Sequence, residues 1–154
     1  MSGSAPHAAR PLRILLVYET LYPSTIGGIE ARNAQLATAL VALGHQVTVA
    51  GLGAGESPAA YQVLPVAPLG KLYTASGRRS LRHTLRFARA VARLDVSHFD
   101  VVETANQFYL HLRALDGRCR GARRPLLVTW YEHWGAYWLE YVGPLLAALA
   151  RAIE

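Results

Sequence analysis

Apolar and polar residues alternate along this chain in blocks that predict strands and helices in turn. Residues 14–18 form an unbroken apolar run, as expected for a strand that is buried on both faces of a parallel sheet. Residues 29–43 then have helical periodicity, with Glu30 among the polar positions on the outer side. Gly44 stands where a helix C-cap glycine belongs, and residues 47–50 form a second apolar strand. This order predicts one βαβ unit.

The rest of the chain continues this alternation. Further strands are predicted over residues 61–66, 99–103 and 126–130. Helices are predicted over residues 78–94, 107–115 and 139–154, the last with Gly143-Pro144 in its first turns, and a basic loop with Cys119 over residues 116–125. We therefore predict an α/β fold, a Rossmann-like three-layer α/β/α arrangement with a mostly parallel sheet. Ligands bind at the carboxyl edge of such a sheet, where the loop after the first strand lies.

The loop before the first helix holds a glycine pair, Gly27-Gly28, which is a candidate site for an anion. Glycine lets backbone N–H groups approach a ligand closely, and a helix N-terminus adds free N–H donors and a positive dipole end. The dinucleotide motif G-x-G-x-x-G is absent, and no Gly-Lys-Ser/Thr follows the pair. A flexible turn is the alternative interpretation.

The first loop ends in Gly27-Gly28-Ile29-Glu30, and the helix after it ends in a Leu43-Gly44-His45 turn. This arrangement resembles the N-terminal domain of glycosyltransferase family 4, which contains retaining, two-domain enzymes of the GT-B fold. The resemblance implies transfer of a hexose from a nucleotide-sugar donor to a glycan, a lipid-linked molecule or a small molecule. It also implies that Gly27 and Gly28 bind the donor phosphates, and that no metal and no tightly bound cofactor is needed.

The resemblance covers nearly all of this chain, but the chain covers under half of the family's enzyme. The family continues into a second Rossmann-like domain that supplies most of the nucleotide contacts. We expect residues 1–11 to be a disordered leader and residues 12–154 to be the acceptor-side domain, incomplete at its C-terminal end and inactive alone. The alternative is a non-catalytic Rossmann-like binding module, or a natural half that needs a partner domain.

The segment after the last predicted strand, residues 129–138 (TWYEHWGAYW), is rich in aromatic side chains. It follows a strand, so it faces the same sheet edge as the glycine pair, where aromatic rings can form a wall for a sugar. A subgroup of the family has a similar run, and a histidine near this point lies close to the donor sugar in the wider family. Tyr131 stands at that position here and His133 follows, so these two are the candidate catalytic residues. Core packing is the alternative for the single tryptophans.

Several residues near this edge are expected to contact the acceptor or the sugar. Glu19 and Glu103 stand at the ends of predicted strands, and capping or loop hydrogen bonds are the alternative for both. The full set of expected contacts is Glu19, Glu30, Glu103, Asn106, Glu132, Trp134 and Tyr137.

The formal net charge is +6, and arginines form a stripe in the predicted helix over residues 78–94, opposite an apolar face with Leu81 and Leu85. A solvated surface is the first interpretation of this stripe, an anionic membrane the second, and nucleic acid the third because no base-reading motif is present. The single cysteine cannot form an internal disulfide, which favours a cytoplasmic protein, peripheral on the inner membrane face under the second interpretation. The stripe comprises Arg78, Arg79, Arg82, Arg86 and Arg89.

Overall fold

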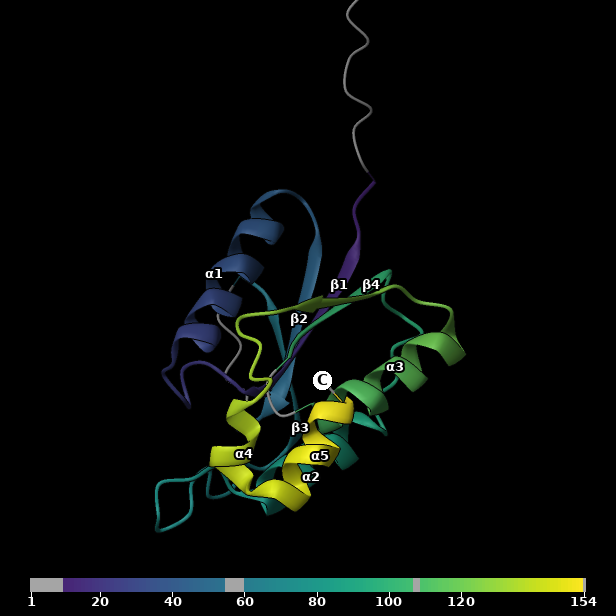
Figure 1. The fold of residues 1–154 in the computed structure, drawn as a ribbon. Helices are drawn as coiled ribbons and strands as arrows, with labels where there is room; N and C mark the ends of the chain where they lie inside the picture. The colour runs from purple at the N-terminus through teal and green to yellow at the C-terminus, as the bar shows by residue number, and fades with distance from the viewer. Residues whose placement is uncertain (1–9, 55–59, 107–108, 154) are drawn as a thin grey trace, which may run out of the picture.

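The structure is a computed structural model that describes residues 10–54, 60–106 and 109–153 (Figure 1). These residues contain one parallel sheet with the strand order β3-β2-β1-β4-β5. The strands are β1 (Arg13–Thr20), β2 (Gln46–Leu52), β3 (Gln62–Ala67), β4 (Val101–Ala105) and β5 (Leu126–Thr129). The first predicted strand is therefore central, and the predicted α/β class is confirmed. Of the expected leader over residues 1–11, residues 1–9 lie outside the described residues.

Helices cover both faces of the sheet and give three layers (Figure 1). The helices are α1 (Gly28–Ala42), α2 (Leu81–Val91), α3 (Leu110–Ala122), α4 (Tyr137–Val142) and α5 (Pro144–Ile153). Side chains of β1 alternate between the layers, because successive residues of a strand point to opposite faces. Leu15 and Val17 pack under α2 and α3, whereas Ile14 and Leu16 pack under α1. No helix in the described part of the chain is long and apolar enough to cross a membrane.

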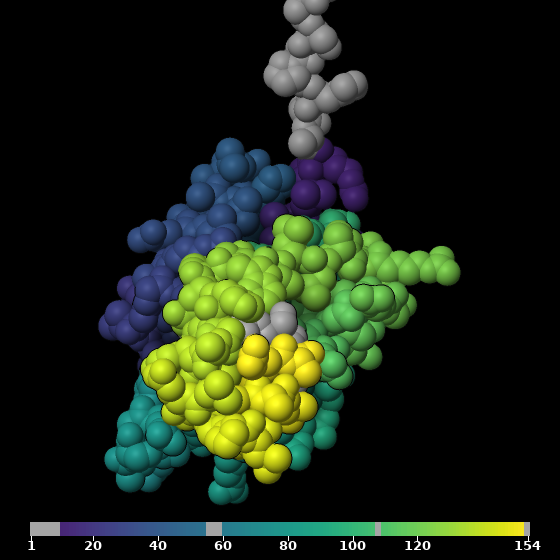
Figure 2. All heavy atoms as spheres, in the orientation of Figure 1, coloured from purple at the N-terminus to yellow at the C-terminus, as the bar shows by residue number. Residues whose placement is uncertain are grey.

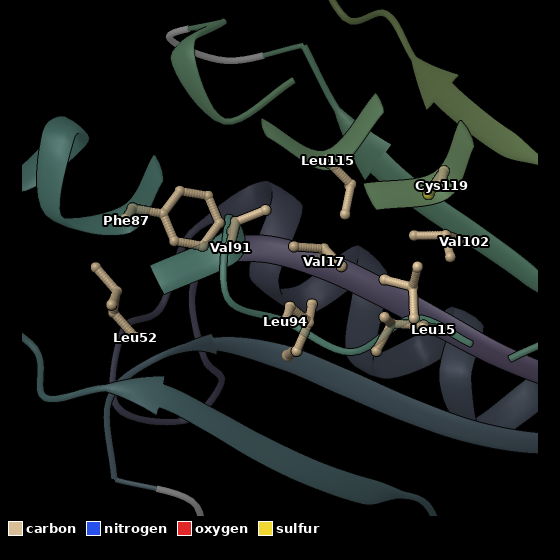
Figure 3. Packing of buried hydrophobic residues seen from close by; sticks show 11 residues of the cluster. Leu15, Val17, Leu52, Phe87, Val91, Leu94, Val102, Leu115 and Cys119 are labelled. Atoms are coloured by element: carbon tan, nitrogen blue, oxygen red, sulfur yellow. The ribbon is translucent and has the colours of Figure 1, made fainter. Parts of the chain in front are cut away.

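The layer formed by α2 and α3 differs from the prediction in the length and rotation of its helices. Phe87 and Val91 of α2 and Leu115 and Cys119 of α3 close over Val17 in the core (Figure 3). Leu115 and Cys119 are four residues apart and so lie on one helix face. Because both side chains pack into the core, α3 extends to Ala122. The predicted basic loop over residues 116–125 is therefore wrong for its first seven residues. Cys119 is buried in the core, and burial raises the pKa of its thiol.

The helix α2 begins at Leu81, three residues later than predicted, because Ser80 acts as its N-cap. The Ser80 hydroxyl accepts a hydrogen bond from the backbone N–H of His83. The predicted apolar face is also wrong, since Leu81 and Leu85 are exposed while Phe87 is buried. Packing of Phe87 rotates the helix so that its arginines and these two leucines share the outer side.

The last predicted helix is in fact two helices, α4 and α5, which form a small lobe with the start of α3. Gly143 separates them with a φ of +80°, a left-handed conformation that glycine tolerates best. Pro144 then occupies the first turn of α5, where its missing N–H costs no helical hydrogen bond. The expected helix end at Glu154 lies outside the described residues.

Candidate functional site

The candidate site lies at the carboxyl edge of the sheet, where β1, β4 and β5 end. The strands are parallel, so the loop that leads to α1 and the aromatic segment that follows β5 leave from the same edge. Both loops therefore lie where the sequence predicted them. The tip of β1 sends its side chains alternately to the two helical layers, with Thr20 toward α1 and Glu19 toward α2.

The glycine pair has two different environments at the start of α1. Gly27 is the N-cap, and Glu30 in the first turn folds back so that its carboxylate meets the position that a Cβ on Gly27 would take. The Thr20 hydroxyl donates a hydrogen bond to the same carboxylate. A Cβ on Gly28, in contrast, would meet only open space. Glu30, which was expected to contact the acceptor or sugar, is therefore buried against Thr20 and Gly27, whereas a side chain on Gly28 would meet open space.

Glu103 links three elements of this edge. Its Oε1 atom accepts hydrogen bonds from Arg32 Nη1 of α1 at 2.8 Å and from the Thr129 hydroxyl of β5 at 2.5 Å. The carboxylate is mostly buried, whereas the Arg32 side chain remains 38% exposed. Glu103 was expected to contact the acceptor or sugar, but its Oε1 atom is bound by Arg32 and Thr129 of the same chain. This carboxylate therefore holds Arg32 in place.

Asn106 fixes the start of the aromatic segment. It is 2% exposed, and its Oδ1 atom accepts from the backbone N–H of Tyr131 at 3.3 Å. Its Nδ2 atom donates to the carbonyl of Glu132 at 2.8 Å. Asn106 was expected to contact the acceptor or sugar, but its side chain is bonded to the loop backbone. It therefore holds the backbone of Tyr131 and Glu132 in place.

The two candidate catalytic residues differ in their surroundings. Tyr131 is 44% exposed, and burial followed by the charge of Glu103 raises the pKa of its hydroxyl, opposed by Arg32. Its ring is thus placed near the Arg32–Glu103 pair. His133 is exposed, with its ring close to Gly135. The charges of Arg32 and Glu103 therefore act on the Tyr131 hydroxyl, and the side chain of Glu132 is exposed.

The remaining aromatic residues divide between packing and exposure. Trp134 packs against Trp138 and Tyr141, with ring centroids 4.6 and 5.0 Å away, so the core-packing interpretation holds for its ring. Trp130 and Tyr137 keep about half of their surfaces exposed. In Figure 2 the yellow-green atoms of this segment and α4 lie beside the yellow atoms of α5. Exposed rings that could face a sugar thus come mainly from the start of the segment.

A buried charge cluster lies on the α2 side of the same edge. Glu19 is 4% exposed and forms an ion pair with Arg79, whose side chain is 9% exposed. His83 places its Nε2 atom 3.4 Å from Glu19 Oε1. Burial raises the pKa of Glu19, and Arg79 opposes this shift. Arg79 is therefore not part of the exposed stripe as predicted, and Glu19 is covered by its partners.

The other arginines of the predicted stripe remain at the surface. Arg78 precedes α2, whereas Arg82, Arg86 and Arg89 lie on its exposed side. They therefore form the part of the stripe that could meet an anionic surface.

Two histidines of the site went unnoticed in the sequence, His83 and His111. His111 lies in α3, with Nε2 at 3.2 Å from the Thr104 hydroxyl and at 3.1 Å from the carbonyl of Ala105. Burial lowers the pKa of His111 to about 4, with the Ala105 bond opposing. His83 lies four residues before Phe87 and His111 lies four residues before Leu115, so helical periodicity places both on buried helix faces. This spacing predicts burial, but it does not show whether a buried histidine meets polar or apolar neighbours.

Metal binding has no visible basis in the part of the chain that the structure describes. No group of three or more His, Cys, Asp or Glu side chains there could hold a metal ion. The expectation that no metal is needed stays a prediction.

These features define a class of protein: a parallel α/β domain with polar and aromatic groups gathered at the carboxyl edge of its sheet. The model of Glycosyltransferase Family 4 matches residues 26–154. Because this match spans most of the chain, the protein belongs to glycosyltransferase family 4, and the resemblance seen in the sequence is confirmed. No curated protein matches the chain.

Two solved structures share a loosely similar arrangement. Both are of the C-terminal domain of PF1911 hydrogenase from Pyrococcus furiosus, at 16% and 17% sequence identity with TM-scores of 0.49 and 0.45. The matches cover 82% and 75% of this chain, and 100% and 89% of those chains. Likeness at this level says nothing about function.

Proposed function

We propose that this chain is the acceptor-side domain of a glycosyltransferase that moves a hexose from a nucleotide-diphosphate sugar to a glycan, lipid-linked or small-molecule acceptor. One observation carries the proposal beyond family membership. Gly28 leaves open space at the N-terminus of α1, at the same sheet edge as the exposed Tyr131. The donor diphosphate would bind at the open space beside Gly28, and the donor sugar would contact the exposed ring of Tyr131.

The residues of this edge suit a reaction in which a diphosphate departs. The backbone N–H of Gly28 and the positive end of α1 would stabilise the negative charge that develops on the leaving group. Arg32, which Glu103 holds in place, would add a positive charge on the same side. Tyr131 would lie near the donor sugar, in the role that a histidine has in the wider family.

The proposal includes a second domain that binds most of the donor and closes over this edge. One sheet edge is a single wall, and stabilisation of developing charge is largest in a site that excludes water. We therefore expect weak nucleotide-sugar binding and no turnover by the 154-residue chain alone. A cytoplasmic enzyme, peripheral on the membrane and free of metal and tightly bound cofactor, completes the proposal.

The experiment compares Gly28→Ala with Gly117→Ala in a protein that includes the second domain. A Cβ meets open space at both positions, so both variants should fold, but only Gly28 lies at the proposed phosphate site. Calorimetry with a panel of UDP-, GDP- and ADP-sugars should show donor affinity lowered about tenfold by Gly28→Ala, which corresponds to the loss of roughly one charge-assisted hydrogen bond. Gly117→Ala should leave it unchanged.

Equal donor affinity in the two variants and the parent would remove the phosphate role. Tyr131→Phe and His133→Asn then distinguish the two candidate catalytic residues, since both side chains are exposed and neither change opens a cavity. We expect transfer to fall with Tyr131→Phe and to persist with His133→Asn. The reverse result would assign the role to His133.

A further inference from the structure

A polar pocket of about 430 Å³ lies between the start of α2 and the loop that precedes it, the loop drawn in teal in Figure 1. Its lining includes Lys71, Thr74, Ser80, Arg82, His83 and Arg86. Three of these side chains are cations at neutral pH, and two carry hydroxyl groups. No acidic residue among the described residues lines the pocket, so its interior favours an anion.

His83 is a buried polar group of this pocket whose ring lacks a hydrogen-bond partner among the described residues. Its side chain is about 1% exposed, and neither ring nitrogen has a hydrogen-bond partner among the residues that the structure describes. The Nε2 atom points toward Glu19, while Nδ1 lies 3.7 Å from the Cβ position of Gly70 in the pocket wall. An unsatisfied buried nitrogen costs free energy, and Nδ1 would recover it by donating its proton to a ligand oxygen in the tautomer that carries the proton on Nδ1.

Gly70 lies next to two nitrogen atoms of the pocket, His83 Nδ1 and Arg86 Nη1, and leaves the space in front of them open. A Cβ at this position would lie 3.4 Å from Arg86 Nη1 and 3.7 Å from His83 Nδ1. A side chain here would therefore fill the volume that both nitrogens face. The absence of a side chain leaves room for a small anion to meet both groups.

The start of α2 adds to the positive potential of the pocket. The first amides of a helix have no partner within the helix, and the helix dipole is positive at this end. The first turn of α1 carries Glu30 to balance this charge, whereas the first turn of α2 carries no acidic residue. A carboxylate of the protein thus offsets the positive end of α1, whereas no carboxylate in the first turn offsets the positive end of α2.

We propose that this pocket binds a phosphomonoester group, and that this group belongs to the acceptor of the glycosyltransferase. The second half of the proposal rests on the proposed function. It is supported by position, because His83 connects the pocket to Glu19 at the tip of β1 and so to the candidate site. Arg82 and Arg86 would pair with the phosphate oxygens, for which the guanidinium geometry is suited. The phosphate can come from a soluble sugar phosphate or from a lipid headgroup.

The test titrates glycerol 3-phosphate into the full 154-residue chain and follows binding by calorimetry and by the nitrogen signals of the His83 ring. We expect saturable binding, a shift of the His83 signals, and affinity at least tenfold weaker in Gly70→Ala and in Arg86→Gln. Arg89→Gln is the matched control, because it removes the same charge from the same helix outside the pocket. Absence of saturable binding, or an equal loss in Arg89→Gln, would overturn the proposal.

A second arm separates the two sources of the phosphate with vesicles of phosphatidic acid and of phosphatidylserine at matched surface charge. Preference for phosphatidic acid that Gly70→Ala abolishes would assign the pocket to a lipid headgroup. Saturable glycerol 3-phosphate binding without such preference would assign it to a soluble acceptor. Equal binding to both vesicles that Arg89→Gln and Arg86→Gln weaken alike, without saturable glycerol 3-phosphate binding, would show only a charged surface.

This outcome is independent of the donor experiment. Failure of glycerol 3-phosphate binding would remove the pocket and leave the effect of Gly28→Ala on donor affinity intact. Failure of the donor experiment would instead leave a phosphate site with no assigned reaction.

Discussion

The buried ion pair between Glu19 and Arg79 gives the most direct test of the charge cluster. Both side chains are more than nine-tenths buried, so neither charge is well solvated when its partner is removed. We expect Glu19→Gln to destabilise the chain because it removes the carboxylate that pairs with the buried Arg79 guanidinium. Arginine stays protonated at all ordinary pH values, so the protein cannot remove this charge by titration.

The size of the effect follows from burial. Removing one partner of a buried pair costs about 3–5 kcal/mol. For a chain of this length each kcal/mol lowers the melting temperature by about 2–4 °C, which gives a loss of roughly 6–20 °C. The double variant Glu19→Gln with Arg79→Met removes both charges, and we expect it to recover most of that loss.

Arg79→Met alone should behave differently, because a carboxyl group can be neutralised. Burial already raises the pKa of Glu19, and loss of Arg79 removes the influence that lowers it. A group whose folded pKa is raised contributes to stability at low pH and loses this contribution as the pH rises through that pKa. The cost of Arg79→Met should therefore grow with rising pH, whereas the cost of Glu19→Gln should not.

Urea unfolding and thermal melts followed by circular dichroism measure both effects. Arg120→Met is the control, because it breaks an exposed pair with Asp116 and should leave the melting temperature unchanged. A Glu19→Gln variant as stable as the parent, or a double variant no better than the singles, would refute the assignment of a buried, mutually compensating pair.

Two further predictions concern His111 and Asn106. The folded pKa of His111, about 4, lies below its ordinary value, so the unfolded chain binds the proton first as the pH falls and stability decreases between pH 6.5 and 4. His111→Asn should flatten the urea-unfolding profile by about 2 kcal/mol between pH 7 and 5. Asn106→Ala should cost about 1–3 kcal/mol and speed proteolysis within residues 130–135, since two loop hydrogen bonds are lost. An unchanged cleavage rate would show that Asn106 does not hold the segment.

Strand positions were predictable because a central parallel strand leaves a strong apolar signal. The run over residues 14–18 could only be buried on both faces, and its central place in the sheet follows. Helix boundaries were less predictable, because they depend on packing partners elsewhere in the chain. The periodicity of α2 allows either Leu85 or Phe87 to face the core, and the space beneath α3 selects Phe87.

The site was predictable in location and less so in detail. Topology alone places the glycine pair and the aromatic segment at one edge, since both follow strands of a parallel sheet. Which groups are engaged by the protein depends on three-dimensional partners, as Glu19 shows with Arg79 sixty residues away. A carboxylate at a strand end reads the same in the sequence whether it meets an acceptor or a buried arginine.

The tip of β1 explains how one sheet edge can provide two anion-favouring environments. Thr20 and Glu19 are adjacent, so their side chains point to opposite layers. Thr20 directs the Glu30 carboxylate over the start of α1, which supplies negative charge there and leaves only Gly28 open. Glu19 is instead paired with Arg79, so its charge is largely compensated before it can offset the cations around His83. The α2 side therefore carries the larger unbalanced positive charge, and a free phosphate should occupy it before it occupies the start of α1.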